Sequence, residues 1–167
     1  MKVTGYETSQ EIHYREYVYE NYLQIPASTK EALLDWASRA GISAGSSTLV
    51  EDIQNAVRNA GVYNPKGEDY PAGVDVAAHF LTVAKEGICQ HFATAGTMLY
   101  RAFGIPARYT VGFAAHVNPD GETSLTTKNA HAWVEIYVDG LGWVPIDVTG
   151  DGAAAPPPQQ EKTELSL

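Results

Sequence analysis

The periodicity of the sequence changes at Gly104–Pro106, and this change constrains the fold more than any other feature. Before it, apolar residues recur at helical spacing, which predicts helices over residues 29–40, 49–60, 76–84 and 89–103. After it, apolar and polar residues alternate, which predicts strands over residues 107–114, 133–138 and 143–148. Helices that precede the strands, rather than alternating with them, are typical of an α+β fold.

The 167 residues divide into three segments. Residues 1–27 contain five tyrosines and are predicted to form an extended N-terminal arm. Residues 28–150 are predicted to form one globular domain, since 44% of the chain is apolar. Residues 151–167 are rich in Ala and Pro at their start and are predicted to be a disordered linker or tail. Two capping-box motifs, at 28–31 and 48–51, predict the starts of the first two helices.

Charge and hydropathy argue against several classes of partner. The chain has a net charge of −9 with only 11 basic residues, which argues against nucleic acid and against docking on anionic lipid. No apolar stretch approaches transmembrane length and the first residues do not resemble a signal peptide, so this chain is not expected to insert into a membrane. Its polar ends are typical of a soluble piece of a longer protein.

Cys89, the only cysteine, follows Gly87 and opens the fourth predicted helix. Unpaired backbone N–H groups and the helix dipole favour a thiolate at such a position, and the thiolate is the reactive form. Ala93, Gly96 and Thr97 form a small-residue face that allows this helix to approach a sheet closely. A lone cysteine that opens an apolar helix is nevertheless most often a small buried hydrophobe.

His131 and Asp147 lie on the two strands of a predicted hairpin, which turns at Asp139–Gly140. Counted outward from that turn, the two residues are almost opposite each other, and directly paired side chains are about 5 Å apart at Cβ. Each residue alone is more often structural, but together with Cys89 they predict a Cys-His-Asp triad. The Cys89 N–H would be one oxyanion donor, with Gln90 and Tyr70 as candidates for the other.

A metal site is the alternative interpretation of the same residues. Cys89 and His91 could form half of a site that His131 and Asp147 complete. Residues two apart on a helix point to different faces, so this chelation is disfavoured. We therefore expect no metal at these residues.

Four motifs, in order, resemble the bacterial transglutaminase-like domain: Gly87-Ile88-Cys89-Gln90-His91-Phe92-Ala93, the run from Leu99 to Tyr109, Ala130-His131-Ala132-Trp133-Val134-Glu135, and Gly142-Trp143-Val144-Pro145-Ile146-Asp147. The resemblance covers roughly residues 48–149. It implies a papain-like fold in which the cysteine helix packs on an antiparallel sheet. It also implies that Cys89 is the nucleophile, His131 the base and Asp147 the orienting group, with no cofactor. Val148-Thr149-Gly150 and Asn129 depart from the family pattern at the rim of the site.

The resemblance further implies cysteine-dependent acyl transfer or hydrolysis at peptide or protein amides through a Cys89 thioester. Members of the family include protein cross-linkers, deamidases and proteases, so the outcome of the reaction stays open. Such domains often form the extracytoplasmic part of membrane-anchored bacterial proteins, and we expect the same location here. The competing hypothesis is a non-catalytic module of the same fold that binds a peptide or protein, with the tyrosine-rich arm over its groove.

Overall fold

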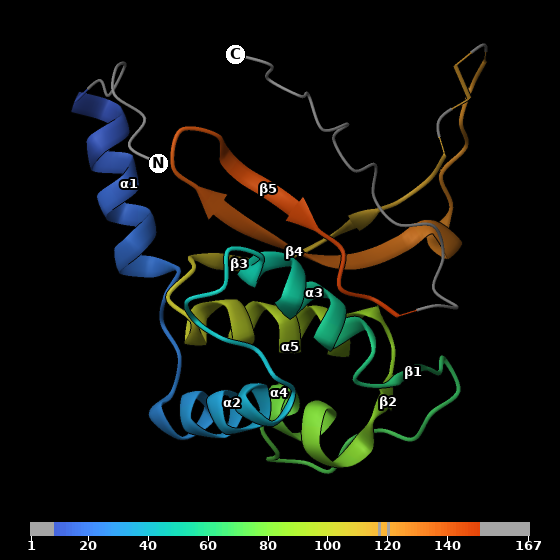
Figure 1. Cartoon of the computed structure of the whole chain (residues 1–167). Helices are drawn as coiled ribbons and strands as arrows, with labels where there is room; N and C mark the ends of the chain where they lie inside the picture. The colour runs from blue at the N-terminus through green and yellow to red at the C-terminus, as the bar shows by residue number, and fades with distance from the viewer. Residues whose placement is uncertain (1–8, 117, 120, 151–167) are drawn as a thin grey trace.

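A computed structural model describes residues 9–116, 118–119 and 121–150 (Figure 1). The helical elements are α1 (Ser9–Asn21), α2 (Ala27–Arg39), α3 (Leu49–Arg58), α4 (Val76–His79), the π-helix η1 (Phe80–Ala84), α5 (Cys89–Ala102) and the 3-10 turn η2 (Thr127–Asn129). The strands are β1 (Val62–Tyr63), β2 (Glu86–Gly87), β3 (Ala107–Phe113), β4 (Ala130–Val138) and β5 (Gly142–Ile146). The predicted α+β class is confirmed. The predicted linker at 151–167 lies outside the described residues.

The main sheet is antiparallel, with β4 between β3 and β5, and α5 runs along one of its faces (Figure 1). A Cβ atom added to Gly96 would come within 2.9 Å of Val148 and 3.0 Å of Val134, so only a glycine lets α5 approach this closely. The predicted small-residue face of this helix is therefore confirmed. On the other side of α5 lie α2 and α4, and the core between the layers contains fully buried Leu33, Phe80, Phe92 and Leu99.

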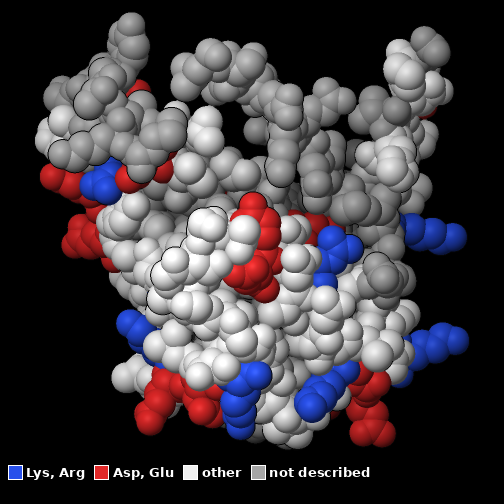
Figure 2. All heavy atoms as spheres, in the orientation of Figure 1, with Lys and Arg blue, Asp and Glu red and all other residues white. Residues whose placement is uncertain are grey.

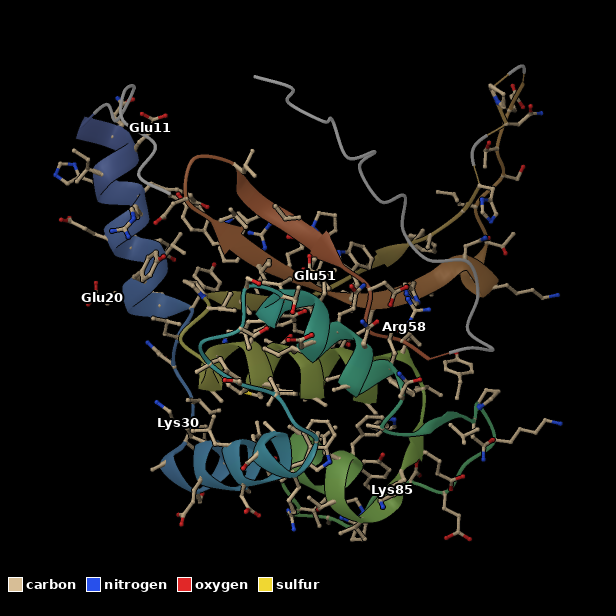
Figure 3. The ribbon with its side chains drawn as sticks, in the orientation of Figure 1. Glu11, Glu20, Lys30, Glu51, Arg58 and Lys85 are labelled. Atoms are coloured by element: carbon tan, nitrogen blue, oxygen red, sulfur yellow. The ribbon has the colours of Figure 1, made fainter. Side chains whose placement is uncertain are left out.

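The N-terminal segment differs from the prediction, because Ser9–Asn21 is helical and not extended. Val18 is buried, and α1 lies beside the turn between β4 and β5 (Figure 3). The Arg15 guanidinium donates to both carboxylate oxygens of Asp139, at 2.9 and 3.0 Å, and Trp143 Nε1 donates to the Tyr14 hydroxyl at 2.8 Å. Polar residues between the tyrosines interrupt any apolar helical pattern in the sequence. The helix is instead stabilised by its tertiary contacts. The domain boundary at residue 28 stays a prediction.

The helix starts are built differently from the predicted capping boxes. Helix α2 begins at Ala27 after Pro26, and the Thr29 hydroxyl donates to Asp75 at 2.5 Å, which ties α2 to the start of α4. Helix α3 begins at Leu49 as predicted, but the Thr48 hydroxyl donates to the Asp52 carboxylate and caps no N–H group. Tertiary and local acceptors thus compete successfully with the helix ends for these hydroxyls.

A short parallel pairing, which the sequence does not predict, precedes the cysteine helix. Val62 pairs with Glu86 and Tyr63 with Gly87, so β1 and β2 join the end of α3 to the residues just before Cys89. The Asn64 N–H donates to the Gly87 carbonyl at 2.8 Å. Strands of two residues are too short to produce an alternating pattern in the sequence.

Candidate active site

The start of α5 is shaped by the close approach of two residues. Ile88 is extended (φ −105°, ψ 174°), and its N–H donates to His91 Nδ1 at 3.0 Å. A Cβ atom on Gly87 would lie 2.6 Å from the same ring nitrogen, so Gly87 allows the His91 ring to fold back over the chain. His91 therefore fixes the helix start, as a structural residue. Cys89 follows as the first helical residue and is half-buried.

The structure brings His131 and Asp147 together. Nε2 of His131 lies 3.0 Å from Oδ2 of Asp147, and the two residues are only 5% and 6% exposed. Because Nε2 faces the carboxylate, Nδ1 is the ring nitrogen left for the thiol. The contact that the hairpin argument predicts is thus present, although the predicted register is wrong.

The β4–β5 turn is longer than the predicted two-residue turn. Val138 pairs with Gly142, which leaves a three-residue loop in which Gly140 has φ +82°. The ladder ends at Val134 and Ile146, so one step further Asp147 would face Trp133 rather than His131. His131 and Asp147 are therefore diagonal neighbours, and side chains at such positions still reach each other.

Asp147 is held in place by groups outside the sheet. The Thr149 N–H donates to its Oδ1 at 2.9 Å, which leaves Oδ2 for His131. Gln54, on α3, donates from Nε2 to the Asp147 carbonyl oxygen at 2.9 Å. The sequence did not identify Gln54, because one polar residue on an amphipathic helix carries no signal of this contact. Helix α3 thus holds the backbone of Asp147, from which the carboxylate projects.

The three side chains shift one another's pKa values. Burial raises the pKa of the Cys89 thiol, but a hydrogen bond with His131 and the backbone N–H groups of Ala132 and Gln90 outweigh it, so the pKa falls below its ordinary value. Hydrogen bonds with Asp147 and then with Cys89 raise the pKa of His131 to about 9. Burial opposes ionisation of Asp147, yet its hydrogen bonds with His131 and Thr149 hold its pKa below the usual range. These directions favour a thiolate–imidazolium pair at neutral pH.

Aromatic side chains surround the three residues. The Trp133 ring is nearly parallel to the His131 ring, with centroids 6.3 Å apart. Burial and then the charge on Cys89 raise the pKa values of Tyr63 and Tyr109, so both phenols lie near the thiol. Neither Tyr63 nor Tyr109 is recognisable from the sequence as part of the site, since they come from β1 and β3, away from the motifs that contain the three residues.

Two polar side chains, Tyr70 and Arg108, have structural partners. The Tyr70 hydroxyl donates its one proton to the Glu86 carbonyl at 2.6 Å, so Tyr70 is not available as an oxyanion donor. Arg108 forms a structural ion pair with Glu135, in which the Arg108 Nε donates to the carboxylate at 2.6 Å. The Arg108 guanidinium also lies 4.2 Å from the centre of the Trp143 ring.

This geometry agrees with a comparison to known families, in which the model of the transglutaminase-like superfamily matches residues 36–148. The chain belongs to the transglutaminase-like superfamily. It is 39% identical over 79 residues to a protein-glutamine gamma-glutamyltransferase of Pseudomonas aeruginosa. It is also 31% identical over 146 residues to the uncharacterized protein YebA of Bacillus subtilis. The matches cover 46% and 80% of this chain but only 12% and 20% of the relatives.

A solved structure supports the same placement in the transglutaminase-like superfamily. The periplasmic domain of TgpA from Pseudomonas aeruginosa superposes with a TM-score of 0.64 at 28% identity, over 80% of this chain and 49% of that chain. The α+β fold is thus that of transglutaminase-like proteins.

Two surface features bear on possible partners. Among the described residues, no helix is long and apolar enough to cross a membrane. On the face shown in Figure 2, the described Lys and Arg side chains are spread over the surface and are not gathered into one basic patch. This face therefore gives no indication of nucleic-acid binding.

Proposed function

We propose that this domain performs cysteine-dependent acyl transfer at protein amides, with Cys89 as nucleophile, His131 as acid and base, and Asp147 as the group that orients His131. The observation that carries the proposal is the buried His131–Asp147 pair beside a thiol whose pKa is lowered. A purely structural cysteine needs neither partner. The directions of the pKa shifts match the requirements of an activated thiol nucleophile.

The reaction follows from the two nitrogen atoms of His131. With Nε2 facing Asp147, Nδ1 takes the proton of the thiol, and the thiolate attacks the carbon of a carboxamide. The Cys89 N–H, in the first turn of α5, stabilises the oxyanion. His131 then protonates the departing ammonia, and a thioester forms between the acyl group and Cys89. A primary amine or water, deprotonated by His131, attacks the thioester and releases the free thiol.

The named relative supports a glutamine side chain as the acyl donor. Protein-glutamine gamma-glutamyltransferase is the name of the Pseudomonas aeruginosa protein to which this chain is similar. If an amine resolves the thioester, the product is a cross-link; if water does, the product is glutamate or a cleaved amide. We propose an extracytoplasmic location on the basis of the similarity to the periplasmic domain of TgpA.

Thiol reactivity tests the proposal most directly. Iodoacetamide should alkylate Cys89 near neutral pH much faster than it alkylates a free cysteine, and His131→Ala should slow this reaction. N,N-dimethylcasein, incubated with a fluorescent primary amine, should become labelled by the wild type and not by Cys89→Ser. Alkylation no faster than that of a free cysteine, without labelling or release of ammonia, would indicate the non-catalytic binding module instead.

A further inference from the structure

We propose that His91 positions the nucleophile: its neutral ring accepts the Ile88 N–H and so fixes the first turn of α5, and a proton on the ring reversibly releases that turn. His91 thus acts through Cys89, as a positioning residue. This inference rests on the proposed function and deepens it, because it names a residue that controls the reactivity of the same thiol.

The first turn of α5 has no conventional cap. Ile88 is the N-cap residue, and its apolar side chain offers no hydrogen-bond acceptor. A Ser, Thr, Asp or Asn at this position would accept a hydrogen bond from the N–H of the second or third helical residue. In α5 the second residue is Gln90, whose N–H helps to lower the pKa of Cys89. A conventional cap would therefore compete with the thiolate for this donor.

His91 stabilises the same turn without using the Gln90 N–H. The Ile88 N–H donates to His91 Nδ1 at 3.0 Å, and the Ile88 carbonyl accepts from the His91 N–H at 2.9 Å. In an ordinary capping box, Glu or Gln at the third helical position bonds to the N-cap N–H in the same way. The Ile88 carbonyl and the Cys89 N–H belong to one planar peptide unit. Holding Ile88 at both of its backbone groups therefore fixes the direction of the Cys89 N–H, the proposed oxyanion donor.

Neighbouring segments hold the His91 ring in this position. The Tyr70 ring stacks on it, with centroids 4.3 Å apart and an interplanar angle of 24°. The Tyr70 hydroxyl donates to the Glu86 carbonyl at 2.6 Å, which ties the loop before α4 to β2. A Cβ atom on Gly87 would lie 2.6–2.9 Å from three atoms of His91, so a side chain there would displace the ring. The contact of Nδ1 with the Ile88 N–H thus depends on three segments of the chain.

The hydrogen bond from Ile88 requires a neutral His91 ring. Nδ1 can accept only while its lone pair is free, so the ring proton is on Nε2. A second proton would place an N–H on Nδ1, opposite the Ile88 N–H, and two donors repel each other. Burial lowers the pKa of His91, and the Asp69 charge opposes this shift. The other titratable groups on the segments around the ring are Tyr63 of β1, Tyr70, His79 of α4, Glu86 of β2 and Cys89 of α5 itself.

The sign of the pH effect follows from the lowered pKa of His91. The hydrogen bond stabilises the first turn fully above the ordinary value of 6.5 and is lost as the pH falls toward the lowered pKa. Protonation of the Cys89 thiolate also lowers reactivity at acid pH. Two separate protons therefore inactivate the wild type, and only one of them binds to the thiolate.

Two replacements of His91 test the proposal. Asparagine keeps an acceptor near the position of Nδ1 and does not titrate, whereas leucine has no acceptor. At about pH 8, where histidine is neutral, iodoacetamide should alkylate Cys89 about five-fold more slowly in His91→Leu, as expected for one hydrogen bond. The rate in His91→Asn should be within about two-fold of the wild type. Below pH 6.5 the wild-type rate should fall more steeply with pH than the His91→Asn rate.

The matched control is His79→Asn, which removes the other histidine that contacts Tyr70 and should retain the wild-type rate and pH profile. An equal change in this control would assign the effect to the packing of Tyr70 and overturn the proposal. A folded His91→Leu protein with the wild-type rate and pH profile would also overturn it. So would acid limbs of equal steepness in the wild type and His91→Asn.

The Ile88 amide gives a second measurement that does not need the leucine variant to fold. Its NMR resonance should titrate below pH 6.5 in the wild type and not in His91→Asn, because the hydrogen bond is lost only where the ring is protonated. An Ile88 resonance that does not titrate in the wild type would remove the inference and leave the reactive thiol intact. Wild-type alkylation no faster than that of a free cysteine would instead remove the proposed function, and this inference with it.

Discussion

Replacing Asp147 with asparagine should greatly weaken the thiolate–imidazolium pair while it preserves the size of the side chain. The wild-type carboxylate accepts two hydrogen bonds, from His131 at Oδ2 and from the Thr149 N–H at Oδ1. An amide has only one oxygen, so it cannot accept both. Either His131 loses its acceptor or the Thr149 N–H is left facing an NH₂ group.

The magnitude follows from the pKa of His131. The pKa rises from 6.5 to about 9, and at about 1.36 kcal/mol per pKa unit this corresponds to about 3 kcal/mol in favour of the imidazolium. The hydrogen bond with Asp147 is the largest cause of this rise, so the variant loses the largest single contribution to that free energy. Because about 1.4 kcal/mol is a factor of ten, the ion pair should become up to about one hundred-fold less populated.

The assay is the second-order rate of Cys89 alkylation by iodoacetamide as a function of pH. In Asp147→Asn the rate near neutral pH should fall about ten- to one hundred-fold, and the acid limb should move toward that of an ordinary thiol. Asp139→Asn, at the exposed ion pair with Arg15, is the matched control and should retain the wild-type profile. A folded Asp147→Asn protein with the wild-type rate and pH profile would refute the reasoning.

Three further predictions follow from the same contacts. The kcat/KM for acyl transfer should decline on the alkaline side near pH 9, where His131 loses its proton. It should also decline on the acid side, below the ordinary thiol pKa, where the Cys89 thiolate becomes protonated. A profile with no alkaline limb would contradict the assignment of His131. Gln54→Leu should cost about 1 kcal/mol in unfolding by urea and should also shift the acid limb of Cys89 alkylation upward, which a merely structural role would not do. Gly96→Val should lower stability by about 1–3 kcal/mol, because its side chain would overlap Val134 and Val148; an unchanged urea midpoint would argue against the close packing of α5.

The longer helices and strands after residue 26 could be predicted because each carries its own periodic pattern, unlike the two-residue strands β1 and β2. The run from Cys89 to Ala102 combines an apolar stripe with a small-residue face, and both are visible in the sequence. Helix α1 lacks a continuous apolar stripe, and Val18 is its one buried apolar residue. Its attachment through Arg15 and Tyr14 depends on the β4–β5 turn, which is more than a hundred residues away.

The candidate site could be predicted in its residues but not in its geometry. Cys89, His131 and Asp147 carry chemistry that is recognisable by residue type and order. The register error arose from Leu141, which extends the turn by one residue and so moves each β5 partner along by one position. With a two-residue turn Asp147 would pair with Ala132 and face away from His131, whereas the longer turn places Asp147 opposite Trp133, on the same face as His131. Gln54 could not be predicted, since its only signal is a contact with a backbone carbonyl.

The early end of β5 explains how the thiol obtains its hydrogen bonds. Ala132 pairs with Val111, whose backbone groups point outward, so the Ala132 N–H must point away from β3. A longer β5 would accept this N–H, but the ladder with β4 stops at Val134 and Ile146. The Ala132 N–H instead contributes to lowering the pKa of Cys89. Ending the ladder before Asp147 thus frees a backbone donor for the thiolate, while the Asp147 carbonyl, on the side of β5 away from β4, accepts from Gln54.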